Sequence, residues 1–186
     1  MRIVGGEYRG RVLTGPSSMA VRPTSDRLRE SLFNILAHGY GELLEGGRVI
    51  DLFAGTGALG LEALSRGARF ALFVDDGAEA RALLRANVDA LGVGGRTKVF
   101  HRDATKLGAA PAGEPFTIAF LDPPYGHELA PRALASLRDG GWLEPGALVL
   151  VEEAADAQLE PPSGYEAIER RAYGDTQVLF LRHVKA

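Results

Sequence analysis

The chain of 186 residues is 46% hydrophobic and 24% charged, a balance typical of a globular protein with one main domain. It contains no cysteine, which excludes disulfides, cysteine-ligated metals and a cysteine nucleophile, and its four histidines lack metal-ligand spacing. There is no apolar run of membrane-spanning length and no signal-peptide core near the N-terminus, so we expect a cytoplasmic protein without a bound metal.

The N-terminal part of the chain differs in charge from the rest. Strand-forming residues and glycine turns over 2–13 predict a short β-hairpin or arm, followed by a proline-punctuated loop over 15–24. Residues 1–30 have a net charge of +3, whereas the remaining 156 residues carry −6. We therefore predict a basic N-terminal hairpin or arm, 1–24, and a main domain, 25–186.

After the arm, helices and strands are predicted to alternate. Ser25 is a candidate N-cap for a helix whose apolar stripe is Leu28, Leu32, Ile35 and Leu36. The predicted strands are 48–54, 69–75, 98–103, 116–122 and 146–153, and further helices are expected over 56–67, 78–91 and 127–139. Such alternation favours an α/β fold with a parallel, doubly wound sheet.

The end of the chain breaks this alternation. Two strand patterns, 165–173 and 176–184, flank Gly174 and Asp175, a pair typical of a tight hairpin turn. A mostly parallel sheet that ends in an antiparallel hairpin is the arrangement of the Rossmann-like, seven-stranded methyltransferase fold. We expect that fold here.

A glycine-rich turn follows the first predicted strand and leaves two cofactor classes open. Gly55, Gly57 and Gly60 have the G-x-G-x-x-G spacing of dinucleotide-binding proteins, and Asp75 ends the next strand at the distance of a ribose-binding acid. A nicotinamide-dependent oxidoreductase is therefore one alternative.

The charge pattern favours the other class. Asp51 lies before the turn, where its carboxylate would repel a pyrophosphate but attract the ammonium and sulfonium groups of S-adenosylmethionine. Asp103 is placed to accept a hydrogen bond from an adenine amino group, and Asp75 to bind the ribose. The predicted cofactor-binding residues are Asp51, Phe53, Ala54, Gly55, Gly57, Asp75, Asp103 and Ala104.

The segment Asp122-Pro123-Pro124-Tyr125 ends the fourth predicted strand and is the candidate catalytic motif. The prolines stiffen the backbone, so the Asp122 carboxylate and the Pro123 carbonyl form a fixed pair of acceptors. Such a pair suits the two N–H groups of a planar exocyclic amine, while Tyr125 offers a ring face on which a base can stack. All four acids, at 51, 75, 103 and 122, fall at carboxyl ends of predicted strands, where ligands bind in such sheets.

Across nearly its whole length the sequence resembles the bacterial small-subunit ribosomal RNA methyltransferase D family. The resemblance rests on MRIVGGEYRGRVL, RPTSDRLRESLFNIL, DLFAGTGALGLEALSRGA and LDPPY, in that order. It implies methyl transfer from S-adenosylmethionine to the exocyclic N2 of a guanine in 16S ribosomal RNA, free or in the small ribosomal subunit. At 74–76 this chain has Val-Asp-Asp, where the family more often has a glutamate. The shorter side chain of Asp75 at the ribose-binding position is a small departure from the family pattern.

Two questions stay open from the sequence. Adenine-N6 and protein-glutamine methyltransferases use the same type of clamp, usually with asparagine in place of Asp122, so they remain alternatives. The basic N-terminal residues are expected to hold RNA phosphates, and the candidates are Arg2, Arg9, Arg11, Arg22, Arg27 and Arg29.

Overall fold

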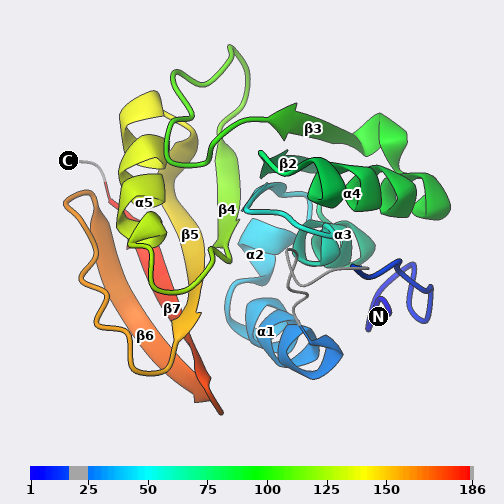
Figure 1. Ribbon diagram of the computed structural model, residues 1–186, viewed down its shortest axis with the longest axis horizontal. Coiled ribbons are helices and arrows are strands. Elements are labelled where there is room, and N and C mark those ends of the chain that lie inside the picture. Colours follow the sequence, from blue (N-terminus) through cyan, green and yellow to red (C-terminus); the bar gives the residue numbers. More distant parts are fainter. Residues whose placement is uncertain (17–24, 185–186) are drawn as a thin grey trace.

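The computed structural model describes residues 1–16 and 25–184, which form a twisted seven-stranded sheet with helices on both faces (Figure 1). The strands are β1 (Arg48–Leu52), β2 (Phe70–Asp75), β3 (Thr97–His101), β4 (Phe116–Leu121), β5 (Leu143–Ala154), β6 (Tyr165–Tyr173) and β7 (Thr176–His183). Their order is β3-β2-β1-β4-β5-β7-β6, with β7 antiparallel to both of its neighbours and the other pairs parallel. The predicted fold class is confirmed.

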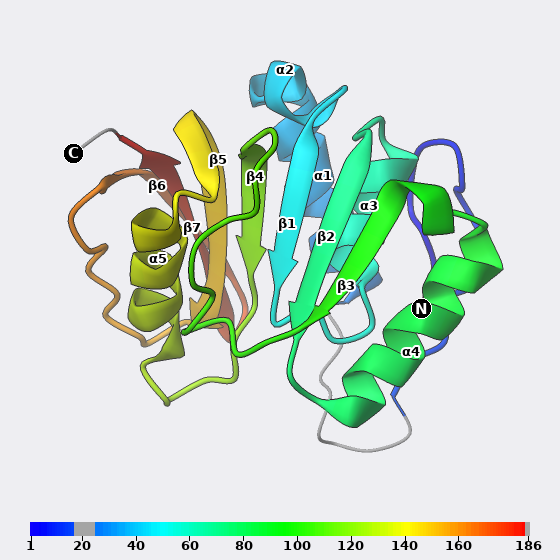
Figure 2. The same cartoon turned by 90° about the horizontal axis from the view of Figure 1, so that it is seen from above.

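Helices cover the two faces unequally (Figures 1 and 2). One face carries α1 (Asp26–Gly39), α3 (Ala58–Ser65) and α4 (Ala78–Leu91), and the other carries α5 (Leu129–Gly140). Because the central strands are covered on both faces, they are apolar at almost every position rather than at alternate ones. No helix in the described part of the chain is long and apolar enough to cross a membrane.

Several predicted boundaries are confirmed by local chemistry. The Ser25 hydroxyl accepts a 3.1 Å hydrogen bond from the N–H of Leu28, which caps α1 as expected. Pro131 lies in the first turn of α5, where a missing N–H removes no helical hydrogen bond. Gly174 has φ 60° in the tight turn between β6 and β7.

Other boundaries were wrong for identifiable reasons. The first strand ends at Leu52, not at residue 54, because Phe53 adopts a left-handed backbone with φ 57°. The third strand ends at His101, and Asp103 belongs instead to the turn that its side chain forms with Thr105. The four-residue helix α2 (Gly41–Leu44) was not predicted, because so short an element has no detectable periodicity.

The first 13 residues form a hairpin-like loop that packs on the main body. The N–H of Ile3 donates to the carbonyl of Arg11 at 3.0 Å, and the buried Ile3 and Leu13 join the core beneath α1 and α3. A Cβ on Gly6, which has φ +80°, would lie 1.9 Å from the Ser65 carbonyl oxygen, so only glycine permits this approach. The predicted division at residue 24 falls outside the described residues.

Candidate active site at the carboxyl edge of the sheet

Strand register places the predicted site residues at one edge of the sheet. Leu52 of β1 pairs with Val74 of β2 on one side and with Leu121 of β4 on the other. The segments that follow β1 and β4, together with the last residue of β2, therefore lie side by side. The β3 segment joins the same edge through the pairing of Asp75 with His101.

The turn after β1 has an unusual backbone. Phe53 and Gly55 are both left-handed, with φ 57° and 58°, and Gly57 follows at 82°. A positive φ at a bulky residue such as Phe53 stores strain that surrounding contacts must hold, a feature common at functional sites. A Cβ on Gly57 would lie 2.3 Å from the Leu84 side chain of α4, so close packing against α4 requires glycine at this second position of the G-x-G-x-x-G spacing.

Asp51 lies beneath this turn rather than in front of it. Its residue is 1% exposed, and Oδ2 accepts a 3.0 Å hydrogen bond from the N–H of Gly60 in α3. Burial raises the pKa of Asp51 well above its ordinary value, and the nearby carboxylates of Asp122 and Asp75 raise it further. The expectation that this charge is open to a ligand is therefore corrected: the side chain ties β1 to α3.

Asp75 connects two loops through its carboxylate. Oδ2 accepts from the N–H of Gly55 at 3.0 Å, and Oδ1 accepts from the N–H of Gly77 at 2.8 Å. The residue remains partly exposed, and a carboxylate oxygen can accept more than one hydrogen bond. Asp75 therefore joins the glycine turn to the end of β2 and can still accept from ribose hydroxyls.

Asp103 is held in one orientation by Thr105. Its Oδ1 accepts both the N–H of Thr105, at 2.8 Å, and the Thr105 hydroxyl, at 2.7 Å. These hydrogen bonds lower the pKa of Asp103, so the group stays ionised. No partner of Oδ2 occurs among the described residues, which suits the predicted contact with an amino group. The adjacent Ala104 is buried in the core.

The candidate catalytic motif follows β4 directly. Pro123 is buried and Pro124 exposed, whereas Asp122 and Tyr125 are partly exposed. The Tyr125 hydroxyl is 2.8 Å from the Thr176 hydroxyl at the start of β7. The structure thus adds Thr176, which no sequence motif indicated, because it is 51 residues away and reaches the site only through the antiparallel hairpin.

The predicted RNA-binding arginines divide into two groups. Arg29 is fully buried, with Nε 3.1 Å from Glu62 and Nη2 2.7 Å from Asp26, so its assignment to RNA phosphates is wrong. Its guanidinium stabilises the core instead. The exposed members are Arg2, Arg9, Arg11 and Arg27, and Arg22 lies outside the described residues.

Glu62 is the residue that fastens the N-terminal loop to the site. It is fully buried in α3, the helix that follows the glycine turn. Its carboxylate accepts hydrogen bonds from the backbone of Val4 and Gly5, both at 3.0 Å, and from the guanidinium groups of Arg29 and Arg66. A lone acid inside the apolar segment ALGLEALS was the signal that could have revealed it, because a buried carboxylate requires such partners.

Known proteins resemble this chain over most of its length. The sequence-family model described as Conserved hypothetical protein 95 matches residues 1–182. Ribosomal RNA small subunit methyltransferase D of Escherichia coli strain K12 is 41% identical over 160 residues, 86% of this chain and 77% of that protein. The protein of the same name from Haemophilus influenzae is 34% identical over 94% of this chain and 89% of that one.

A solved structure agrees with these matches. Escherichia coli yhhF, described as a candidate methyltransferase, superposes with a TM-score of 0.84 at 32% identity, covering 99% of this chain and 98% of that one. The fold and the edge of the sheet described above define a class I methyltransferase that uses S-adenosylmethionine. The chain belongs to the ribosomal RNA small subunit methyltransferase D family.

Proposed function

We propose that the protein transfers a methyl group from S-adenosylmethionine to the exocyclic N2 of a guanine in 16S ribosomal RNA, within the RNA or the small ribosomal subunit. The observation that carries the proposal is the position of residues 122–125, which follow β4 beside the glycine turn after β1. The names of the relatives support ribosomal RNA as the substrate.

The residues at this edge fit the cofactor by their chemistry. S-adenosylmethionine supplies an electrophilic methyl group on a sulfonium. The carboxyl groups of Asp75 and Asp122, which lie close enough to the buried Asp51 to raise its pKa, make the site suitable for a cation. Asp75 would hold the ribose and the free oxygen of Asp103 the adenine amino group, while Phe53, Ala54, Gly55 and Gly57 line the turn and Ala104 the adenine side.

The clamp acts by positioning the target amine. The Asp122 carboxylate and the Pro123 carbonyl accept its two N–H groups, and the rigid Pro123-Pro124 backbone keeps these acceptors in place. The clamp would present the amine nitrogen to the methyl group of the cofactor, so that the N–C bond forms as the C–S bond breaks and S-adenosylhomocysteine is released. The acceptors would stabilise the positive charge on nitrogen until a proton passes to solvent. Tyr125 stacks on the base, and its hydroxyl bond to Thr176 fixes the ring orientation.

Exposed arginines of the N-terminal loop and of α1 would hold the RNA around the target. Arg2, Arg9, Arg11 and Arg27 are available to phosphates. Glu62 connects this loop to α3, so the arginines of residues 1–13 would have a fixed relation to the clamp.

Two other amines could enter the same clamp. Adenine-N6 and protein-glutamine methylation require no different acceptors, so the clamp alone does not choose among them. We prefer guanine because the resemblance to the methyltransferase D family, which implies guanine N2 as the target, includes the N-terminal segments as well as the motifs that many methyltransferases share. The relatives of this chain are named as methyltransferases, so the alternative of a nicotinamide-dependent oxidoreductase is no longer supported.

The decisive experiment incubates the protein with labelled S-adenosylmethionine and small ribosomal subunits that lack the modification. Digestion to nucleosides should release labelled N2-methylguanosine. Labelled N6-methyladenosine, or label in protein alone, would leave the clamp chemistry intact and refute the substrate.

A further inference from the structure

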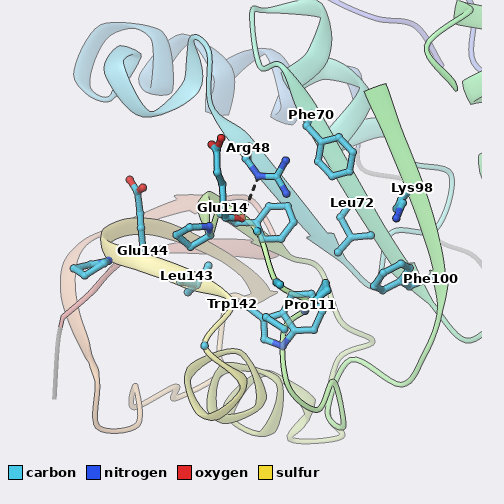
Figure 3. Close-up of a pocket in the computed structure, with 17 residues that line it drawn as sticks. Arg48, Phe70, Leu72, Lys98, Phe100, Pro111, Glu114, Trp142, Leu143 and Glu144 are labelled. Carbon is cyan, nitrogen blue, oxygen red and sulfur yellow. Dashed lines mark hydrogen bonds between the residues drawn. The ribbon is translucent and has the colours of Figure 1, made fainter. Parts of the chain in front are cut away.

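A second site lies on the face of the sheet that carries α5, near the ends at which β1, β2 and β4 begin. A pocket of about 530 Å³ opens there, large enough for a small ligand, and Figure 3 shows the side chains that line it. Arg48, Phe70 and Phe116, which begin strands β1, β2 and β4, all contribute. Residues 102–115, which connect β3 to β4, form a loop rather than a helix, and part of this loop borders the pocket.

The guanidinium of Arg48 is fixed by its neighbours. It lies 4.5 Å from the ring centroid of Phe70 and 4.9 Å from that of Phe116, and Nε donates to the Glu114 carbonyl at 3.2 Å (Figure 3). Among the described residues, no acceptor pairs with its two terminal nitrogens. Burial lowers the pKa of Arg48, as does the nearby charge of Arg69. An oriented guanidinium edge of this kind suits bidentate contact with an anion.

Aromatic surface adjoins this cation. Phe70 and Phe100 are partly exposed, and Leu72 lies between them in Figure 3. The Arg102 guanidinium lies 4.8 Å from the Phe100 ring centroid, so a second cation borders the aromatic wall. Aromatic faces flanked by arginine and lysine are the usual means of holding unpaired nucleotides, with bases stacked and phosphates paired.

The charge balance favours a ligand with one negative charge. Arg48 and Lys98 line the pocket together with Glu114 and Glu144. The Glu114 carboxylate pairs with Arg69, so Glu144 alone opposes the two pocket cations. A phosphodiester carries a single negative charge, whereas a terminal phosphate carries between one and two at neutral pH.

We propose that this pocket binds one unstacked nucleotide of the RNA substrate, with its base against Phe70 and Phe100 and its phosphodiester on Arg48 and Lys98. This inference rests on the proposed function, because it assumes that RNA is the substrate. The five residues of β1 separate Arg48 from the methyl-transfer edge by roughly 17 Å, although Phe100, which pairs with Val74, lies nearer to that edge. The phosphodiester held on Arg48 is therefore not that of the methylated nucleotide. The site anchors RNA away from the clamp.

The sole tryptophan, Trp142, lines this pocket and provides a local probe. Titration with a short single-stranded oligoadenylate should change its fluorescence. Arg48→Gln and Lys98→Gln should each weaken binding about tenfold, and the double variant should lower the salt slope by about 0.7, the share of one phosphate. Arg85→Gln is the matched control, because Arg85 is an exposed arginine of α4, on the other face of the sheet, and should change affinity less than twofold.

Steady-state kinetics of methylation of small ribosomal subunits separate the pocket proposal from the proposed methyltransferase function. Arg48→Gln should raise KM for subunits without changing kcat or cofactor affinity. Unchanged RNA affinity in folded Lys98→Gln and Arg48→Gln proteins would overturn the pocket assignment, and Lys98 is exposed, so its variant should fold. Binding of benzoate or adenosine monophosphate with no response to the oligomer would also overturn it. Failure of the unaltered protein to methylate any RNA would refute the proposed function, while the titration would still decide what the pocket binds.

Discussion

The side chain of Asn87 in α4 donates a 2.9 Å hydrogen bond to the carbonyl of Thr56, inside the glycine turn. The same side chain accepts from the N–H of Thr14 at 2.7 Å and donates to its carbonyl at 3.1 Å. A single buried amide therefore joins the N-terminal loop, the turn beside the cofactor site and α4.

Replacement of Asn87 by alanine should destabilise the protein and weaken cofactor binding. The change leaves the Thr14 and Thr56 backbone groups without partners, so the free energy of unfolding should fall by about 2–4 kcal/mol. Denaturant titration and calorimetry with S-adenosylhomocysteine measure the two effects. Asn34→Ala is the control: Asn34 is exposed on α1, and its replacement should change the free energy by less than about 0.5 kcal/mol. Equal effects of the two variants would contradict the bridging role.

The carboxyls of Asp51 and Asp103 should affect the pH dependence of stability in opposite directions. The raised pKa of Asp51 means that the folded state binds its proton more tightly than the unfolded state. Its contribution is therefore greatest below the unfolded pKa of about 3.9 and declines as pH rises toward the folded pKa. The lowered pKa of Asp103 gives a contribution that is present above about 3.9 and lost as pH falls through its folded pKa.

Unfolding free energies measured between acid and neutral pH check both signs. Asp51→Asn can still accept from Gly60, and relative to the unaltered protein it should gain stability as pH rises. Asp103→Asn should lose stability over the same change. A pH-independent difference for Asp51→Asn would show that the carboxyl is not perturbed as its burial implies.

Tyr125 and Thr176 should act as a coupled pair in catalysis. Tyr125→Ala removes the stacking face and should reduce kcat roughly ten- to hundredfold, whereas Tyr125→Phe keeps the ring and should lose only severalfold. Thr176→Val removes the same hydrogen bond from the other side and should resemble Tyr125→Phe. The double variant should then cost no more than either single change, and strictly additive losses would disprove the coupling.

Asp122 should matter far more for turnover than for cofactor binding. Asp122→Ala deletes a proposed acceptor of the clamp and should abolish detectable methyl transfer, while the affinity for S-adenosylhomocysteine changes less than fivefold. Asp122→Asn restores one acceptor oxygen and should recover part of the activity. Near-normal turnover of Asp122→Ala at saturating substrate would rule out the clamp mechanism.

Much of this arrangement could be predicted from the sequence, because it follows from local patterns. Alternating apolar segments and the Gly174-Asp175 turn indicate the sheet, and parallel strands bring Asp75, Asp103 and Asp122 to one edge. The direction in which individual side chains point was harder to predict from the sequence. Nothing in the sequence shows that Asp51 lies under the turn or that Arg29 pairs with Glu62, since both depend on contacts between segments far apart in the chain.

The N-terminal arginines should contribute to RNA affinity but not to cofactor affinity. Arg9 is exposed, and Arg11 is exposed although its guanidinium donates to the Ala90 carbonyl at 2.5 Å. Replacing both by alanine should weaken RNA binding and lower the slope of log affinity against log salt by about 0.7–0.9 for each phosphate that the protein no longer binds. Filter binding across a range of salt concentrations measures this slope.

A matched change of charge elsewhere tests whether position matters. Arg170 and Arg171 lie on β6, at the far edge of the sheet, and their double alanine variant removes the same two charges. This variant should leave the salt slope unchanged, because long-range attraction between exposed charges is screened within about 8 Å at physiological salt. If both double variants reduce RNA affinity equally, the arginines act through net charge alone, and the N-terminal loop makes no direct phosphate contacts.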